Sequence, residues 1–147
     1  MDEMIQRFNA HHVRYLLIGG QAVRLAGMPR FSMDWDFYVP PSDDMNLKKI
    51  NELLRDDLDV PLAPMGPRGE NFVQTYQTRW GIVQFHMGGP GLPDFAEAEK
   101  RAVTAVTESG TPVRCLTDED LLRSKEAAGR PQDAADAEFL RLKRQAP

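Results

Sequence analysis

The order of apolar and polar residues in the first 40 positions predicts a helix, a strand, a second helix and a second strand. Apolar residues at helical spacing in residues 4–8 indicate a short amphipathic helix. Residues 14–20 form an apolar run that two glycines end, which is typical of a short buried strand. Residues 21–27 then indicate a helix of about two turns, and alternation in residues 31–39 predicts a second strand.

The middle of the chain continues in the same way. Residues 43–58 carry one apolar stripe at helical spacing behind acidic residues, so we expect a helix there. Residues 71–77 and 80–87 indicate two strands that are antiparallel neighbours. A loop leads from them into a short acidic helix before residue 103, and a Ser-Gly turn within residues 103–116 predicts a β-hairpin.

Helix signals are clearest in the last part of the chain. Thr117 and Asp120 form the pattern of a capping box, which predicts the start of a helix. Gly129 is typical of a helix end, and Pro131 is typical of the first turn of a following helix. We expect this second helix to run to about Lys143.

Together these elements predict an α+β fold. We expect a small mixed β-sheet with helices packed on one face and a helical hairpin at the C-terminal end. A length of 147 residues fits a single domain. Within it, residues 1–115 form the predicted core and residues 116–147 a helical tail.

Composition narrows the class of protein. The net charge is -4, with 18 basic and 22 acidic residues, which argues against a protein that mainly coats nucleic acid. The single cysteine, Cys115, excludes an internal disulfide and a thiolate metal cluster. No apolar run approaches the roughly 20 residues that span a bilayer, and the first residues are polar and acidic. We therefore expect a cytoplasmic protein that does not enter a membrane.

Two aspartates stand inside the strand predicted for residues 31–39. Because Asp34 and Asp36 are two residues apart, their carboxylates enter one volume and repel each other unless a cation lies between them. Hard oxygen ligands suit Mg²⁺ or Mn²⁺, so the pair predicts a divalent metal site. The alternative is the solvated face of an edge strand.

The glycines before them complete a candidate site. Gly19 and Gly20 let the backbone approach a ligand closely, and a helix opening at Gln21 points free N–H groups at a phosphate. The alternative is an ordinary strand-to-helix turn.

This pattern of Gly-Gly, a spacer of about a dozen residues and Asp-x-Asp between apolar residues resembles the nucleotidyltransferase superfamily related to DNA polymerase beta. Within it, the chain is most similar to small prokaryotic minimal nucleotidyltransferases and abortive-infection toxin enzymes. The tail is similar to the helical segment of that group, and Arg30 also matches. The matching residues of the tail are Lys125, Arg130, Asp133 and Asp136.

The resemblance implies transfer of a nucleoside monophosphate from a nucleoside triphosphate to an acceptor hydroxyl of an RNA end, a protein or a small molecule. Asp34 and Asp36 would ligate Mg²⁺ or Mn²⁺ in a catalytic role. The implied nucleotide-binding residues are Gly19, Gly20, Gln21, Arg30, Lys125 and Arg130. Lys125 and Arg130 either neutralise triphosphate charge or join the tail to the core.

The chain departs from the family pattern at one position. Active members carry a third carboxylate on a later strand, and Gln84 stands at that position here. A base or ligand could then come from His86, which is predicted to be catalytic, or from Asp94. The alternative is a weak or inactive member that binds a nucleotide or a partner, for example in a toxin–antitoxin pair. A homodimer or a partner protein could complete the cleft.

Overall fold

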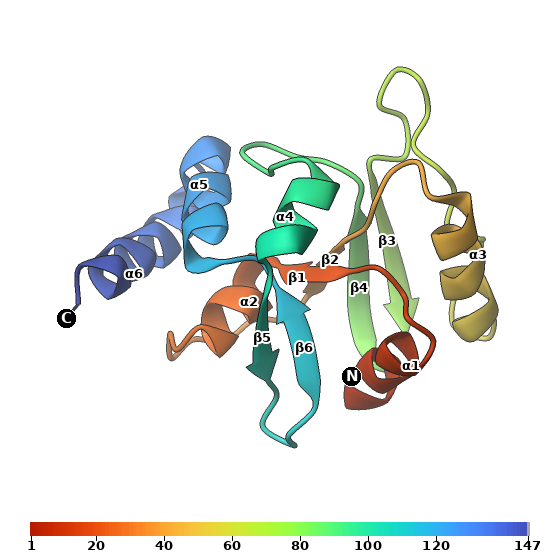
Figure 1. Cartoon of the computed structure of the whole chain (residues 1–147), viewed down its shortest axis with the longest axis horizontal. Coiled ribbons are helices and arrows are strands. Elements are labelled where there is room, and N and C mark those ends of the chain that lie inside the picture. Colours follow the sequence, from red (N-terminus) through yellow and green to blue (C-terminus); the bar gives the residue numbers. More distant parts are fainter. Residues whose placement is uncertain (147) are drawn as a thin grey trace.

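The computed structural model describes residues 1–146, so the last residue of the predicted domain, 147, lies outside it. Six strands form one sheet in the order β3-β4-β2-β1-β6-β5 (Figure 1). The strands are β1 (Leu16–Ile18), β2 (Trp35–Tyr38), β3 (Val73–Thr78), β4 (Gly81–His86), β5 (Val103–Val106) and β6 (Pro112–Cys115).

Six α-helices and one short 3₁₀ helix, η1 (Pro131–Asp133), surround the sheet. The α-helices are α1 (Asp2–Ala10), α2 (Gly19–Leu25), α3 (Asp44–Leu53), α4 (Phe95–Arg101), α5 (Asp118–Ala128) and α6 (Ala134–Gln145). Between residues 1 and 146, none of these helices has the length and apolar character needed to cross a bilayer.

The strand pairings make the sheet mixed. Two hairpins, β3–β4 and β5–β6, lie at its edges. The central strand β1 is antiparallel to β2 and parallel to β6, and β2 is parallel to β4. The α+β class, the mixed sheet and both predicted hairpins are confirmed.

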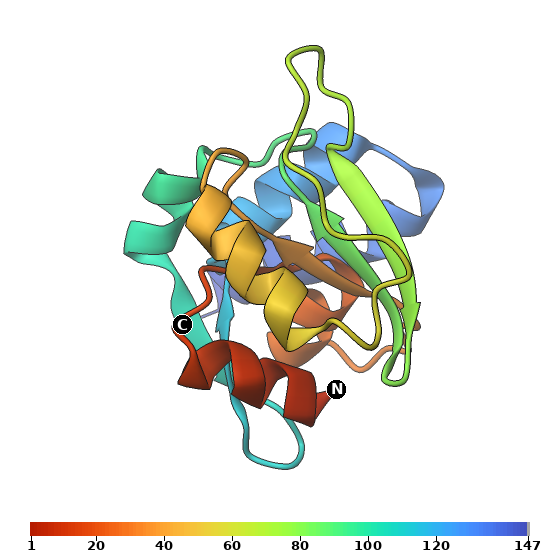
Figure 2. The ribbon, with the colours of Figure 1, turned by 90° about the vertical axis from the view of Figure 1, so that its right-hand side faces the viewer.

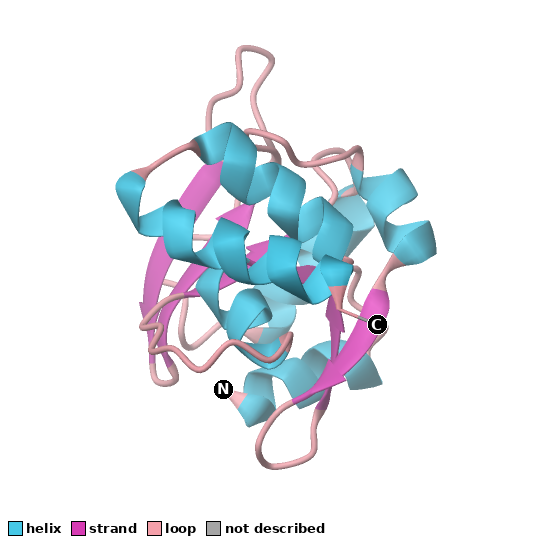
Figure 3. Ribbon diagram, turned by 90° about the vertical axis from the view of Figure 1, so that its left-hand side faces the viewer, coloured by secondary structure: helices cyan, strands magenta, loops and turns pink. Residues whose placement is uncertain are grey.

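The helices cover both faces of the sheet rather than one. Phe8 of α1 lies 6.0 Å from Phe37 of β2, measured between ring centroids, whereas the next residue, Tyr38, lies 5.1 Å from Phe95 of α4. Neighbouring residues of a strand point to opposite faces, so α1 and α4 lie on opposite sides of β2. Helices α1 and α3 stand before the sheet in Figure 2, and α5 and α6 stand before it in Figure 3.

Both faces are apolar because the central strands are buried on both sides. All three residues of β1 are buried, and so are Phe37, Tyr38 and Phe85 of the strands beside it. Phe37 and Phe85 lie 6.1 Å apart across β2 and β4, and both pack against Phe8. Burying aromatic side chains of this size contributes roughly 1.5–3 kcal/mol each to folding.

Several elements differ in their bounds from the sequence prediction. The strand predicted for residues 14–20 is only Leu16–Ile18, and the helix predicted to open at Gln21 begins at Gly19. The strand predicted for residues 31–39 is only Trp35–Tyr38, because β1 turns into α2 at Gly19 and leaves the earlier residues without a partner on that side. The helix predicted for residues 43–58 ends at Leu53. Asp34 therefore lies one residue before β2 and not inside a strand.

The tail forms the predicted helical hairpin. The Thr117 hydroxyl accepts a hydrogen bond from the backbone N–H of Asp120 at 3.1 Å and so caps α5. Gly129 ends α5 with a φ of 60°, a left-handed conformation that glycine adopts at little cost. Pro131 begins η1, which leads directly into α6.

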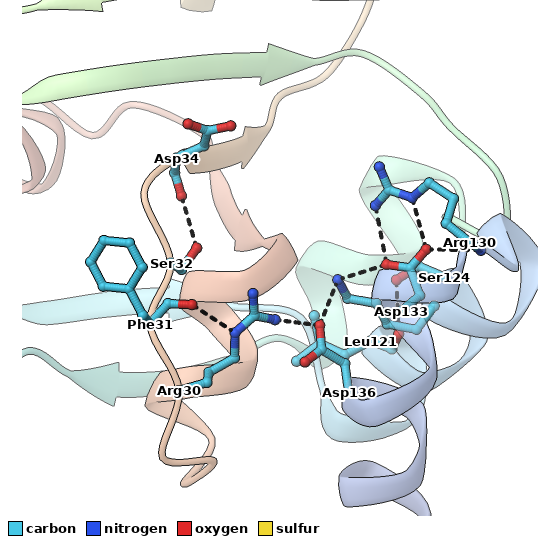
Figure 4. A network of polar contacts seen from close by, with 10 residues as sticks. Arg30, Phe31, Ser32, Asp34, Leu121, Ser124, Arg130, Asp133 and Asp136 are labelled. Atoms are coloured by element: carbon cyan, nitrogen blue, oxygen red, sulfur yellow. Dashed lines mark hydrogen bonds and ion pairs between the residues drawn. The ribbon is translucent and has the colours of Figure 1, made fainter.

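A buried ion network joins this hairpin to the core. Lys125 Nζ lies 3.2 Å from Asp133 and 2.9 Å from Asp136, and all three side chains are almost fully buried. The Arg30 guanidinium, from the segment before β2, bonds to Asp136 (Figure 4). The Arg130 guanidinium forms two hydrogen bonds to Asp133, at 2.8 and 3.1 Å. Removing one member of such a network leaves a buried charge unpaired and is strongly destabilising.

This network predicts a specific dependence of stability on pH. The Arg130 guanidinium, and after it Lys125, lowers the pKa of Asp133 from 3.8 to about 2. A depressed carboxyl pKa stabilises the fold above the unfolded value of 3.8, and this stability is lost as pH falls through about 2. The Asp133→Asn variant lacks this titration. Its deficit in unfolding free energy relative to wild type should therefore be full above pH 4 and shrink toward pH 2.

Urea unfolding curves at several pH values between about 2 and 6 measure this difference. Glu138→Gln, on the exposed side of α6, is the matched control and should run parallel to wild type at every pH. A constant deficit for Asp133→Asn across this range would contradict the assignment.

Candidate active site

A cleft of about 520 Å³ opens where the β1–α2 turn, the segment before β2 and the end of β4 meet the α5–α6 hairpin. The walls of the cleft come from both parts of the chain that carry the family resemblance, namely the glycine and aspartate motif and the helical tail. Tertiary structure thus brings together residues that are separated by about a hundred positions, such as Asp34 and Asp133.

The two aspartates share the cleft with Gln84. Asp36 is the second residue of β2, and its partner in the parallel pairing of β2 with β4 is Gln84. Asp34 lies two positions earlier, is half-buried, and also lines the cleft. All three residues line the cleft, and the side-chain amide of Gln84 offers a neutral oxygen in addition to the two carboxylates.

His86 lies on the same face of β4, two residues beyond Gln84. Its Nε2 atom is 2.8 Å from Oδ1 of Asp36, and both side chains are less than one-fifth exposed, 19% and 17% respectively. A hydrogen bond of this length fixes the orientation of the imidazole. The predicted catalytic residues Asp34, Asp36 and His86 therefore lie together in one cleft.

The glycine turn lies directly against Asp36. Gly19 has a φ of +70°, and a Cβ atom added there would lie 2.6 Å from Oδ2 of Asp36. A Cβ at Gly20 would lie 2.7 Å from the Ser32 hydroxyl oxygen and 3.0 Å from Nη2 of Arg30. Any side chain at either position would push these groups aside. The close approach that was predicted for a ligand is thus also used by the protein itself.

Gln21 does not line the cleft with its side chain. The side chain is buried, its Nε2 donates to the Ser32 carbonyl at 2.7 Å, and its Oε1 accepts from Nε of Arg24 at 2.8 Å. Gln21 therefore holds the segment before β2 in place. Its predicted part in nucleotide binding would fall to its backbone N–H, in the first turn of α2.

Three cations and four carboxylates line the cleft. Arg30, Lys125 and Arg130 surround Asp133 and Asp136, whereas within residues 1–146 Asp34 and Asp36 have no such cation bonded to them. The bidentate bond to Asp133 raises the pKa of Arg130, which stays charged while its side chain remains largely exposed to the cleft. The contacts that join the tail to the core are therefore present, and Arg130 is the member of this network whose charge stays accessible from the cleft.

Asp94, the other acid considered as a replacement for the third carboxylate, lies elsewhere. It is an exposed residue at the N-cap of α4, and it is not among the residues that line the cleft. His86 and Gln84 are the groups that the fold places beside the aspartate pair.

The donor atoms in the cleft fit a hard divalent cation only in part. Two carboxylates and an amide oxygen are donors of the type that Mg²⁺ and Mn²⁺ prefer. In residues 1–146 no group of three histidine, cysteine, aspartate or glutamate side chains is arranged to hold a metal ion. Asp34, Asp36 and Gln84 offer two carboxylates and one amide oxygen, so a divalent cation at this place would need further oxygen ligands from a bound molecule.

Phe31 and Met33 are among the cleft residues that were not predicted from the sequence. The alternation in residues 31–39 predicted that both would lie in a strand. Instead both precede β2, and Met33 is 67% exposed. Because the alternation signal in residues 31–39 ignores where the neighbouring strand ends, the sequence alone could not reveal this.

Comparison with solved structures identifies the fold. TM1012 from Thermotoga maritima, a candidate nucleotidyltransferase, matches with a TM-score of 0.64 and 14% identity, over 97% of this chain and 89% of that one. The lincosamide antibiotic adenylyltransferase LnuA, in its lincomycin-bound structure, matches with a TM-score of 0.60 and 17% identity, over 95% of this chain and 92% of that one.

The structure of ANT(2")-Ia in complex with adenylyl-2"-tobramycin matches with a TM-score of 0.57 and 14% identity, over 93% of this chain and 83% of that one. Comparisons with protein-family models and with curated proteins find no match. At sequence identities of 14–17%, the matches to solved structures show that the helices and strands are arranged alike. The chain has a nucleotidyltransferase-like fold.

Proposed function

We propose that this protein transfers a nucleoside monophosphate from a nucleoside triphosphate to an acceptor hydroxyl. The observation that carries the proposal is that one cleft is lined by Asp34, Asp36, the Gly19–Gly20 turn and the exposed Arg130 of the tail. A nucleoside triphosphate fits this combination. Its phosphate charge would be balanced by Arg130 and by a metal ion, and the carboxylates would hold that metal ion beside the reacting phosphorus atom.

In the proposed reaction, the acceptor oxygen forms a bond to the α-phosphorus and the bond to the β-phosphate oxygen breaks, so pyrophosphate leaves. The hydroxyl proton passes to a base in the cleft, for which His86, oriented by Asp36, is the candidate. Arg130, which is exposed to the cleft, would neutralise charge on the leaving pyrophosphate, while the buried Lys125 holds Asp133 and Asp136 in place beside it. Asp34 and Asp36 would hold Mg²⁺ or Mn²⁺, which stabilises charge on the phosphoryl oxygens when bound.

A small molecule is the acceptor class that the comparisons support. LnuA binds lincomycin, and ANT(2")-Ia forms a complex with an adenylylated aminoglycoside. The match with LnuA extends over 95% of this chain and 92% of that one. A cleft of about 520 Å³ lies in the size range of small-molecule sites, so we favour a small molecule over an RNA end or a protein side chain as the acceptor.

One observation favours a second function. Gln84 occupies the strand position beside Asp36, and a glutamine can neither accept the proton nor balance metal charge as a carboxylate does. The protein would then bind a nucleotide or a partner, for example within a toxin–antitoxin pair, without efficient transfer.

The first test is removal of the carboxylate charges. Asp34→Asn and Asp36→Asn keep the side-chain shape but lose the metal ligands, so nucleotidyl transfer should fall at least about a hundredfold. Transfer is measured with α-labelled nucleoside triphosphates and a panel of aminoglycosides and lincosamides, with and without a chelator. Glu97→Gln, an exposed acid on α4, is the control and should retain full activity. Unchanged transfer in Asp34→Asn would refute the proposal.

The second test isolates the contact between the glycine turn and Asp36. Gly19→Ala strains a backbone with φ +70° and forces a Cβ to within 2.6 Å of Asp36 Oδ2. Gly110→Ala imposes similar strain at φ +89° with no atom within 4 Å of its Cβ, so it is the matched control. Both should lose about 1–2 kcal/mol of stability from the backbone, but only Gly19→Ala should also lose nucleotide binding. Equal binding by the two variants would mean that the turn is not part of the site.

The third test separates a transferase from a binding module. Gln84→Glu places a carboxylate beside Asp36 and Asp34. If transfer is slow because that group is missing, turnover should rise about tenfold or more, since general-base help is typically worth 10²–10⁴-fold. Gln77→Glu, on the edge strand β3, is the control. Nucleotide binding without transfer in wild type and in Gln84→Glu would favour the binding module.

A further inference from the structure

Two large apolar side chains stand at the mouth of this charged cleft. Phe31 is 79% exposed and Met33 is 67% exposed, and both line the cleft. Single exposed apolar residues are ordinary in proteins. Two large ones within three residues of the chain, both lining the same cleft, are typical of a binding site. Among the described residues that line the cleft, Phe31 is the one phenylalanine, tyrosine or tryptophan.

The backbone that carries these side chains is held by specific contacts. The Ser32 carbonyl accepts the hydrogen bond from Gln21 Nε2 at 2.7 Å, and the Phe31 carbonyl accepts one from Arg30 Nε at 3.1 Å. Arg30 is itself bonded to Asp136 of α6 (Figure 4). These hydrogen bonds hold the backbone of Phe31 in place. A backbone that is already ordered lowers the entropic cost of binding a ligand.

The charges of the cleft give a ligand a direction. Lys125 and Arg130 lie on the side of the α5–α6 hairpin, and in Figure 4 the Phe31 ring points away from that hairpin. The phosphates of a nucleoside triphosphate would lie toward the cations. The nucleoside, which is joined to the other end of the phosphate chain, then extends toward Phe31 and Met33.

We infer that Phe31, with Met33 beside it, forms the surface on which the nucleobase of the triphosphate stacks. This inference rests on the proposed function. A ring face stacks on any base, and a methionine thioether contacts ring edges favourably. Phe31 therefore contributes affinity for the nucleoside part of the substrate without selecting one base.

The test compares ligands with and without a nucleobase. Isothermal titration with Mg-ATP and with magnesium tripolyphosphate is carried out on wild type and Phe31→Ala. Phe31→Ala should bind Mg-ATP about tenfold more weakly, the typical effect of losing one base–aromatic stack. Tripolyphosphate affinity should be unchanged. Phe31→Trp, which keeps an aromatic face, should bind Mg-ATP as wild type does, and Mg-GTP and Mg-UTP should respond to Phe31→Ala as Mg-ATP does.

The control is Phe72→Ala, because Phe72 is another phenylalanine that is 49% exposed but does not line the cleft. It should leave both affinities unchanged. Thermal melting and size-exclusion chromatography of every variant show whether the fold and the oligomeric state are kept.

The outcomes distinguish this inference from the proposed function. If Phe31→Ala binds Mg-ATP as wild type does while tripolyphosphate also binds, the nucleobase inference is wrong and the triphosphate site stands. An equal loss of affinity for both ligands, or conversion of a dimer to a monomer, would also overturn it, because each result assigns Phe31 another role. If wild type binds neither ligand, the inference and the proposed function fail together.

Discussion

The close contact between the Gly19 turn and the carboxylate of Asp36 is the constraint on which the cleft depends. Because Gly19 has no Cβ, the backbone at the end of β1 can lie against Asp36 of β2. Asp36 pairs with Ile18, the last residue of β1. Strand pairing fixes this register, so the first turn of α2 and the aspartate segment cannot move apart without breaking the centre of the sheet. Peptide dipoles and a carboxylate are thus held together at one place.

The helical tail belongs to the same site because charge ties it there. Lys125 lies between Asp133 and Asp136, and Arg30 reaches Asp136 from the segment that leads to Asp34. Buried ion pairs add little net stability compared with apolar packing, but they fix which surfaces meet. Here they place α5 and α6 along one wall of the cleft and leave Arg130 exposed within it.

Much of the chain follows from local rules. Helix caps at Thr117 and Gly129 and the hairpins around β3–β4 and β5–β6 depend on interactions between near neighbours, and these predictions are confirmed. The spacing of Asp34 and Asp36 was enough to predict a site, because two neighbouring carboxylates without a partner are costly to desolvate. The prediction that helices cover one face of the sheet was wrong, because helices cover both faces and β1 is buried on both sides. A short apolar run indicates a buried strand but does not indicate how many helical layers bury it.

Local sequence patterns were enough to predict most helices and strands, two helix caps and the Gly-Gly and aspartate residues of the cleft. Which residues meet in the cleft depends on long-range pairing: Gln84 and His86 lie beside Asp36 because β4 pairs with β2 in parallel register. The tertiary structure also turned Gln21 inward as a support for Ser32 and turned Phe31 outward. These outcomes depend on where β1 ends relative to β2, a contact between segments distant in the chain that no local pattern encodes.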